Sequence, residues 1–138
     1  MNPPRKVTRE FLREQQPQVF RFFEDIARGT GFPDTKRVVE SLIRNRSKWN
    51  EEAALTELDL QKMDIVFPNP LIRLPPSIGN LTSLKELNFS GNQLESLPEE
   101  IGNLENLEVL VLSKNQLKSL PKSICNLRKL NHLSCISN

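Results

Sequence analysis

The sequence predicts an α/β solenoid in which a helical N-terminal cap is followed by a short arc of stacked coils with a parallel concave sheet. Two observations carry the prediction. The phrase at residues 81–90 returns 23 residues later and starts again after a further 23. Before it, apolar residues recur at the three- and four-residue intervals of amphipathic helices. We expect a cap over residues 1–54 and about 3.5 coils over residues 55–138.

The coils are defined by positions that coincide when the copies are aligned at this spacing. Three apolar positions and one asparagine position recur, which a chance amphipathic helix would not maintain. The coinciding sets are Leu84, Leu107 and Leu130; Leu87, Leu110 and Leu133; Phe89, Leu112 and Cys135; and Asn92, Asn115 and Asn138. A second phrase, L-P-x-x-I, lies between them at residues 74–78, 97–101 and 120–124.

In this register the chain resembles the leucine-rich repeat family, in its 23-residue L-P-x-x-I-G-N-L type, over roughly residues 55–138. The resemblance implies that Asn92 and its counterparts turn inward and bond backbone groups of adjacent coils, because buried amides do not stay unpaired. It also implies a curved stack that presents an extended concave surface for binding.

Each coil is expected to hold one short strand and one turn or short helix. Polar and apolar residues alternate in residues 86–90, so Leu87 and Phe89 face inward and their neighbours face outward. Pro98 and Pro121 remove a backbone donor on the opposite side, which favours a turn or short helical stretch there. A single coil would not be stable, because its apolar burial does not offset the entropy of ordering it.

Two helices are predicted near the N-terminus. Proline suits the first turn of a helix and is costly inside one, so Pro17 divides the apolar pattern. We therefore expect a short helix over residues 9–15, capped by Thr8, and a longer helix over residues 17–28.

The rest of the cap is expected to hold one more helix, which begins after Asp34 and ends near Asn45. Ser47 is expected to start a short turn that contains Trp49. Six of the eight aromatic residues lie in the cap segment, enough apolar bulk to cover the open edge of a first strand at residues 57–60.

The first coil is longer than the others, because Leu58 precedes Leu87 by 29 residues instead of 23. The extra residues lie between residues 61 and 70 and are apolar and proline-ended. They either fold over the cap helices or form a binding protrusion at the concave rim, where a partner uses exposed apolar side chains.

The last coil is expected to have an open edge. The sequence stops at Asn138, within a fourth repeat whose convex half and C-terminal cap are missing. A strand at residues 132–136 would then expose unpaired backbone groups, which favours self-association. A fragment of a longer array and a natural truncation both fit.

Charge is divided unevenly along the chain. Residues 1–50 carry eleven Lys or Arg against six Asp or Glu, and residues 51–138 carry eight against eleven. A basic segment can meet nucleic acid, but these basic residues are spread among acidic ones, and the aromatics look buried rather than exposed for base stacking. We favour a solvated helical surface and do not expect nucleic acid as a partner.

The hydropathy pattern bears on location. The sequence has no run of 18 apolar residues and no apolar stretch near its start, so we expect no membrane insertion and a cytoplasmic protein. A helical cap before such repeats also resembles the leucine-rich repeat effectors that pathogenic bacteria inject into host cells. That resemblance implies delivery by a non-classical secretion route if this chain is such an effector.

Few residues suggest chemistry. Cys125 and Cys135 fall at inward positions and are interpreted as small apolar fillers, with neither a disulfide nor a metal site expected. The one histidine, His132, is interpreted as a surface residue, because the pattern places no nucleophile beside it and no paired carboxylates in a cleft. We expect no cofactor and no enzymatic activity.

The sequence therefore favours a non-enzymatic module that binds a protein partner through its concave face and adjoining loops. Val109 and Val111 are the most informative outward residues, since a partner would explain two valines on a solvent face, although chance exposure explains them as well. The predicted contact residues are Glu57, Asp59, Gln61, Glu86, Asn88, Ser90, Val109, Val111, Ser113, His132, Ser134 and Ile136.

Twelve residues are fewer than the roughly 20 to 30 per side of a standard interface. A stable partner is therefore expected to contact residues 61–70, the cap helices or further repeats as well. The alternative interpretation is a substrate-recognition fragment of a larger effector or enzyme whose catalytic domain lies outside this chain.

Overall fold

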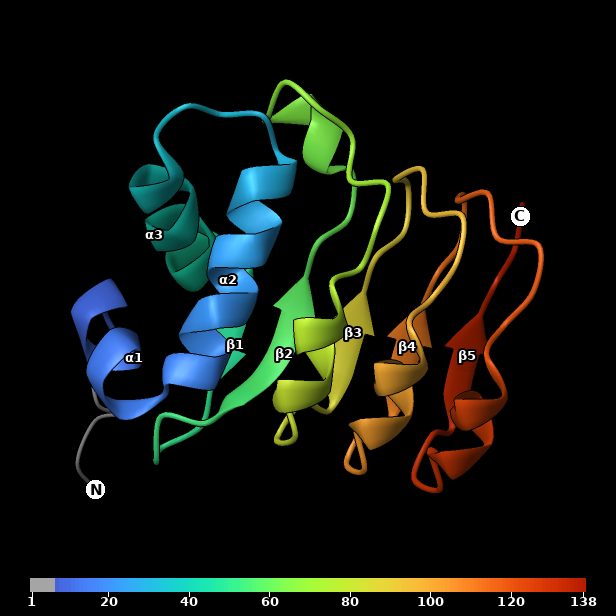
Figure 1. Cartoon of the computed structure of the whole chain (residues 1–138). Coiled ribbons are helices and arrows are strands. Elements are labelled where there is room, and N and C mark those ends of the chain that lie inside the picture. Colours follow the sequence, from blue (N-terminus) through green and yellow to red (C-terminus); the bar gives the residue numbers. More distant parts are fainter. Residues whose placement is uncertain (1–6) are drawn as a thin grey trace.

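The structure is a computed structural model that describes residues 7–138, and these residues form the α/β solenoid with a helical cap (Figure 1). The helices are α1 (Arg9–Gln15), α2 (Pro17–Gly29) and α3 (Thr35–Asn45). The strands are β1 (Ser47–Trp49), β2 (Leu55–Asp59), β3 (Glu86–Asn88), β4 (Val109–Val111) and β5 (His132–Ser134). Short 3-10 helices are η1 (Met63–Ile65), η2 (Pro76–Asn80), η3 (Glu99–Asn103) and η4 (Lys122–Asn126).

The cap helices begin where the sequence places their capping residues. The Thr8 hydroxyl accepts a hydrogen bond from the Phe11 amide at 3.0 Å, and the Asp34 carboxylate accepts one from the Arg37 amide at 3.2 Å. Each bond satisfies an amide that the first helical turn leaves unpaired. Pro17 starts α2, which runs one residue past its predicted end.

The prediction of a turn around Trp49 is wrong, because this segment is strand β1, paired antiparallel with β2. The link between the two strands turns on Asn50, whose Oδ1 accepts hydrogen bonds from the Glu52 and Ala54 amides at 2.9 and 3.0 Å. An asparagine can hold a tight turn in this way without glycine. The cap segment therefore covers the edge of β2 as predicted, and it does so with a strand that contains Trp49.

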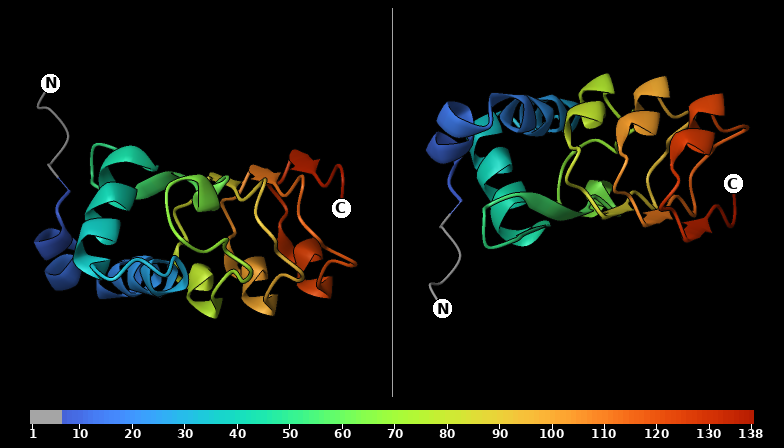
Figure 2. Two further views of the ribbon diagram at one scale, coloured as in Figure 1. Left: turned by 90° about the horizontal axis from the view of Figure 1, so that it is seen from above. Right: turned by 90° about the horizontal axis from the view of Figure 1, so that it is seen from below.

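The molecule has two layers with the core between them. The sheet runs in the order β1 to β5, and β2 to β5 are parallel. On the other side, η2, η3 and η4 form a row that α2 continues into the cap (Figure 2). The proline phrases thus form short helices on the convex side, as predicted.

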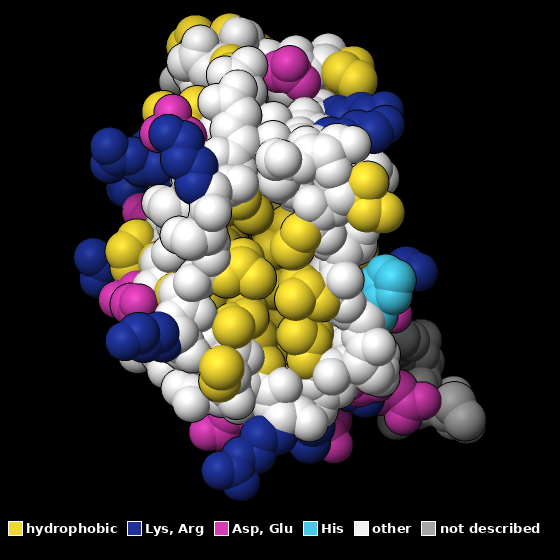
Figure 3. All heavy atoms as spheres, turned by 90° about the vertical axis from the view of Figure 1, so that its right-hand side faces the viewer, with side chains coloured by type: hydrophobic (Ala, Val, Ile, Leu, Met, Phe, Trp, Pro, Cys, Tyr) yellow, Lys and Arg dark blue, Asp and Glu magenta, His cyan; other side chains and the backbone are white. Residues whose placement is uncertain are grey.

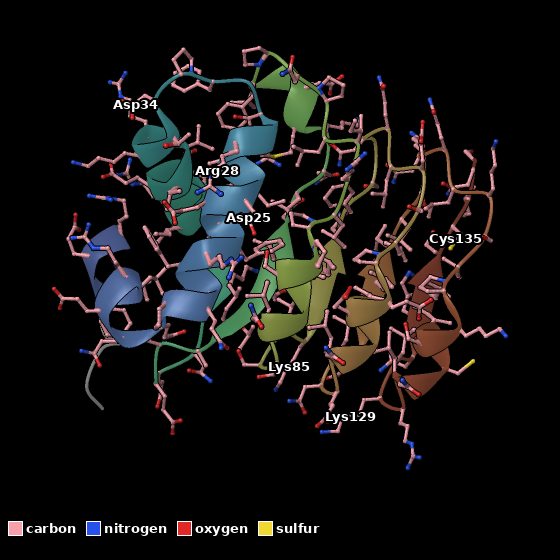
Figure 4. All side chains as sticks on the ribbon, in the orientation of Figure 1. Asp25, Arg28, Asp34, Lys85, Lys129 and Cys135 are labelled. Atoms are coloured by element: carbon pink, nitrogen blue, oxygen red, sulfur yellow. The ribbon has the colours of Figure 1, made fainter. Side chains whose placement is uncertain are left out.

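Helix α2 is fastened to the first convex segment by side chains. The Ser77 hydroxyl donates a hydrogen bond to the Asp25 carboxylate at 2.6 Å. Asp25 also pairs with Arg28 at 2.9 Å, one turn further along α2 (Figure 4). One continuous hydrophobic core then runs from Leu12 in α1 to Leu127 in the last coil, so cap and repeats share their interior.

Buried asparagines join successive coils, as the family resemblance implies. The Asn92 side-chain amide donates to the Leu60 and Phe89 carbonyls at 2.8 and 3.0 Å, and its Oδ1 accepts from the Met63 amide at 3.2 Å. Asn115 repeats this pattern one coil later, with bonds to Phe89, Leu112 and Leu94. Asn138 makes the same bonds on the last coil, where it is exposed.

The residue before this position in the repeat turns the chain, and in the first coil the position itself is held by Met63 instead of asparagine. The turning residues in the four coils are Lys62, Gly91, Lys114 and Ser137, with φ values of 48, 71, 57 and 64°. These angles lie in the left-handed region, which costs a residue with a side chain about 1 kcal/mol or more. The asparagine bonds beside each turn hold the chain in this conformation.

The long first coil folds back over the cap. Met63 is buried, and the ring centroids of Phe67 and Phe32 lie 6.1 Å apart. The backbone amide of Asn69 donates a hydrogen bond to the Thr30 carbonyl at 3.0 Å. The structure thus supports the first of the two interpretations for the core of this segment. Its tip still exposes two apolar side chains, Ile65 at 74% and Val66 at 59%.

The prediction that Cys125 faces inward is wrong, since its side chain is exposed. Its position in the repeat is that of Gly79 and Gly102, which face the following coil. A Cβ atom on Gly102 would lie 2.6 Å from the Cβ of Ser123. Cys125 therefore points along the solenoid axis. Cys135 packs against the core as expected, and burial raises the pKa of its thiol.

The last coil presents an apolar end. Hydrophobic side chains gather in the centre of the end face in Figure 3. Leu133 is 42% exposed, whereas Leu110, its counterpart one coil earlier, is fully buried. The difference arises because β5 pairs with a strand on one side only within the described residues.

Replacing Asn115 by alanine should lower the free energy of unfolding by about 2 kcal/mol, because buried carbonyls and an amide lose their partner. Chemical denaturation measures the change. The exposed Asn103, replaced by alanine in the same way, is the control and should cost less than about 0.5 kcal/mol. Equal losses in the two variants would contradict the role of the inward asparagines.

Candidate functional site

The open face of the sheet, which we call the concave face, holds all the predicted contact residues. Strand pairing aligns them in three rows across the coils. The inward leucines of β2 to β4 are buried, whereas the outward residues are partly or fully exposed. The rows are Glu57, Glu86, Val109 and His132; Asp59, Asn88, Val111 and Ser134; and Gln61, Ser90, Ser113 and Ile136.

A hollow of about 300 Å³ lies on this face where the cap meets the sheet. Its floor is formed by β2, β3 and β4, including Val109 and Val111. Its wall is formed by the end of α3 and by β1, including Arg46 and Lys48. The structure therefore gives the predicted face a closed end that flat strands alone would not provide.

The wall residues are functional candidates that the sequence interpretation missed. The Lys48 ammonium lies 3.5 Å from a Glu57 carboxylate oxygen. The Arg46 guanidinium donates to the backbone carbonyls of Gln61 at 2.8 Å and Asp59 at 3.4 Å. Both residues reach the site because β1 pairs with β2. The alternation of Ser47, Lys48 and Trp49 beside a turn-forming asparagine is a signal that could have identified this strand.

The carboxyl groups of Glu57 and Glu86 face each other across β2 and β3. A hydrogen bond to Glu57 raises the pKa of Glu86 above its ordinary value, and burial and the charge of Glu57 act in the same direction. The same hydrogen bond lowers the pKa of Glu57, and Lys48 adds to this effect. Two carboxyl groups that share a hydrogen bond favour binding of one proton or one cation between them.

The second and third rows are held by short hydrogen bonds. Asp59 accepts from the backbone and side-chain amides of Gln61, both at 3.1 Å. Asn88 accepts from the Ser90 amide at 3.0 Å and hydroxyl at 2.7 Å. These bonds fix the polar side chains at the ends of β2 and β3 before any partner arrives, so binding would not have to order them.

The middle of the face is apolar. Val109 and Val111 are half-buried on β4, between polar residues of β3 and β5. Their neighbours on β5, His132 and Ser134, are exposed and half-buried respectively. The face therefore changes from acidic at the cap to aliphatic at β4 within three strands.

The prediction that no paired carboxylates lie in a cleft is wrong, because Glu57 and Glu86 face each other in the hollow. Across residues 7–138, no group of three or more His, Cys, Asp or Glu residues is placed to hold a metal ion. His132 lies on β5 beside Val109 rather than beside a nucleophile or carboxylate on the neighbouring strand. The face offers fixed polar groups, paired carboxyl groups and aliphatic surface.

The pattern of the family described as Leucine-rich repeat region matches residues 50–138, more than half of the chain. The chain therefore belongs to the leucine-rich repeat family, whose stacked repeats generally serve as non-enzymatic interaction modules. A comparison with curated protein sequences gave no match.

Solved structures share the fold. A leucine-rich repeat protein of Leptospira interrogans is 27% identical over the whole chain, with a TM-score of 0.54. A chain from the BIR3–SERK2 complex of Arabidopsis thaliana is 27% identical over 76% of this chain, with a TM-score of 0.50. The leucine-rich repeat domain of the type III effector XopL is 21% identical over 92% of this chain, with a TM-score of 0.53.

This chain spans only part of those structures, covering 36%, 55% and 41% of their lengths in the order given. The XopL likeness supports the comparison of fold with a bacterial effector. Among the helices that the structure describes, none is long and apolar enough to cross a bilayer.

Replacing Glu86 by glutamine should raise the free energy of unfolding at pH 7 by about 0.5 kcal/mol, because repulsion with Glu57 disappears and the pair is largely solvated. A carboxyl whose pKa is raised by folding destabilises the fold once it is ionised. The gain should therefore shrink as the pH falls toward 4.5, the ordinary glutamate value.

Chemical denaturation at pH 7 and near pH 4.5 measures this difference. The exposed Glu95, replaced by glutamine, loses the same charge away from Glu57 and is the control. The assignment fails if both variants respond equally at each pH.

Proposed function

We propose that this chain is a non-enzymatic module that binds a protein partner through the concave face and the loops beside it. The observation that carries the proposal is the hollow at the cap end, where preformed acidic groups and two valines share one floor. Two neighbouring valines on a solvent-facing strand are explained if a partner covers them, and the acidic groups beside them would then form a polar edge of the interface.

The composition of the face fits a protein better than a nucleic acid. Glu57, Asp59 and Glu86, which line the hollow, would repel phosphate groups. The plant relative that is 27% identical comes from a structure of a protein complex, BIR3 with SERK2. Protein partners are thus a recognised use of this fold among chains of similar sequence.

The size of the surface indicates where else the partner binds. Four parallel strands at about 4.8 Å spacing give a strip only some 15 Å wide. The third row begins at Gln61, directly before the segment whose tip exposes Ile65 and Val66. We propose that these two side chains extend the interface beyond the strip, because exposed neighbouring aliphatic side chains favour a binding surface.

Two related predictions from the sequence stay open. The module would use the same face if it served as the recognition part of a larger effector or enzyme. Self-association through β5 also stays a prediction, and Leu133 and Ile136, exposed by 42% and 72%, are the side chains such contact would cover.

Replacing Val109 and Val111 together by glutamate should abolish capture of the partner and leave the fold intact, since both side chains point away from the core. The matched control replaces the exposed Ser96 and Ser119 by glutamate, which adds the same charge elsewhere on the coils. Quantitative pull-down from candidate lysates compares these variants with the wild type, and thermal melting checks the fold. Unchanged capture by the valine variant would exclude the concave face.

A further inference from the structure

The concave face is graded along the solenoid axis, and the gradient has a direction. Glu57, Asp59 and Glu86 place three carboxyl groups on β2 and β3, next to the cap. Val109 and Val111 follow on β4. A ligand that complements this order must carry positive charge at one end and aliphatic surface at the other.

The cations in the wall of the hollow offset only part of the acidic charge, because Lys48 and Arg46 lie beside three carboxyl groups. The Lys48 side chain is 76% exposed and approaches Glu57 at 3.5 Å. The Arg46 guanidinium is bound to backbone carbonyls at 2.8 and 3.4 Å. Within residues 7–138, the ion pairs found do not include Glu86. Glu86 therefore faces Glu57 and the hollow without a cation of its own.

Strand spacing sets the distance between the two ends. The point midway between Glu57 and Glu86 lies about one and a half strand spacings from β4, or roughly 7 Å. Two residues of an extended chain advance by nearly the same distance, about 6.6 to 6.8 Å. Side chains at positions n and n+2 of an extended segment also point to the same side.

We propose that the partner, if it binds as proposed above, presents an extended segment with the order basic, any residue, aliphatic. Its Lys or Arg side chain lies between Glu57 and Glu86, and its aliphatic side chain lies over Val109 and Val111. The segment runs across the strands from the cap toward β5. An arginine suits the first position best, because its planar fork can bond both carboxylates.

The charge order excludes two other occupants of this face. An acidic segment would add a third negative group to the Glu57–Glu86 pair. A wholly aliphatic segment would bury those carboxyl groups without a partner, which costs binding energy. A segment with the reverse order would bind only by running in the opposite direction along the face.

The test is affinity selection of a random peptide phage library on the immobilised full chain, followed by titration of a selected synthetic peptide. Selected peptides should share a basic residue two positions from an aliphatic one. Replacing Glu57 and Glu86 together by glutamine should weaken binding of such a peptide about tenfold, which corresponds to about 1.4 kcal/mol. Replacing the peptide's basic residue by glutamine should cause no further loss in that variant.

The matched control replaces Glu95 and Glu99 by glutamine, which removes the same charge from exposed positions and should leave binding unchanged. Some peptides could bind poorly to the variant with glutamate at positions 109 and 111 but normally to the variant with Glu57→Gln and Glu86→Gln. That result would overturn the proposed place of the peptide's basic residue and leave the proposed function intact. A selection that yields no peptide sensitive to the valine variant would overturn both.

Discussion

An inward asparagine after each of β3, β4 and β5 ties its coil to the one before it, and the geometry of the repeats depends on these bonds. The side-chain amide of Asn115 bridges Phe89 of the preceding coil and Leu112 of its own coil. The side-chain oxygen of Asn115 accepts a hydrogen bond from the Leu94 backbone amide, which would otherwise be buried without a partner. Because the same bonds recur at Asn92 and Asn138, successive strands keep one register, and outward residues form straight rows.

The cap acts as an incomplete coil. Strand β1 supplies the sheet layer and α2 supplies the convex layer, so the first repeat has a neighbour on both sides of the core. The Ser77–Asp25 bond fixes the convex contact. This arrangement also serves the site, since pairing of β1 with β2 brings Lys48 beside Glu57 and closes one end of the concave face.

Periodicity explains how much the sequence could predict. The inward leucines and the asparagines recur at fixed spacing, so their burial and the strand register followed from the pattern. Strand β1 could not be found in this way, because it occurs once and depends on a turn at Asn50. The prediction that Cys125 faces inward was wrong because this position of the repeat does not point into the core. Glycine holds the same repeat position in the two earlier coils. At Gly102 a side chain would clash with the next coil and not with the core.

The contacts between coils fix the positions of the site residues. The chemistry of the site comes from the outward positions, which these contacts do not restrict. Close packing at Gly102, where a Cβ would lie 2.6 Å from Ser123, holds the coils at one spacing. That spacing makes the distance from the glutamate pair to the valines equal to two residues of an extended chain. Outward residues carry no packing role in the core, so acidic and aliphatic groups can be placed along the rows with little cost in stability. In the proposed interaction, a partner would recognise the order of acidic and aliphatic groups along the axis, and the inward asparagines hold the strands that carry these groups in register.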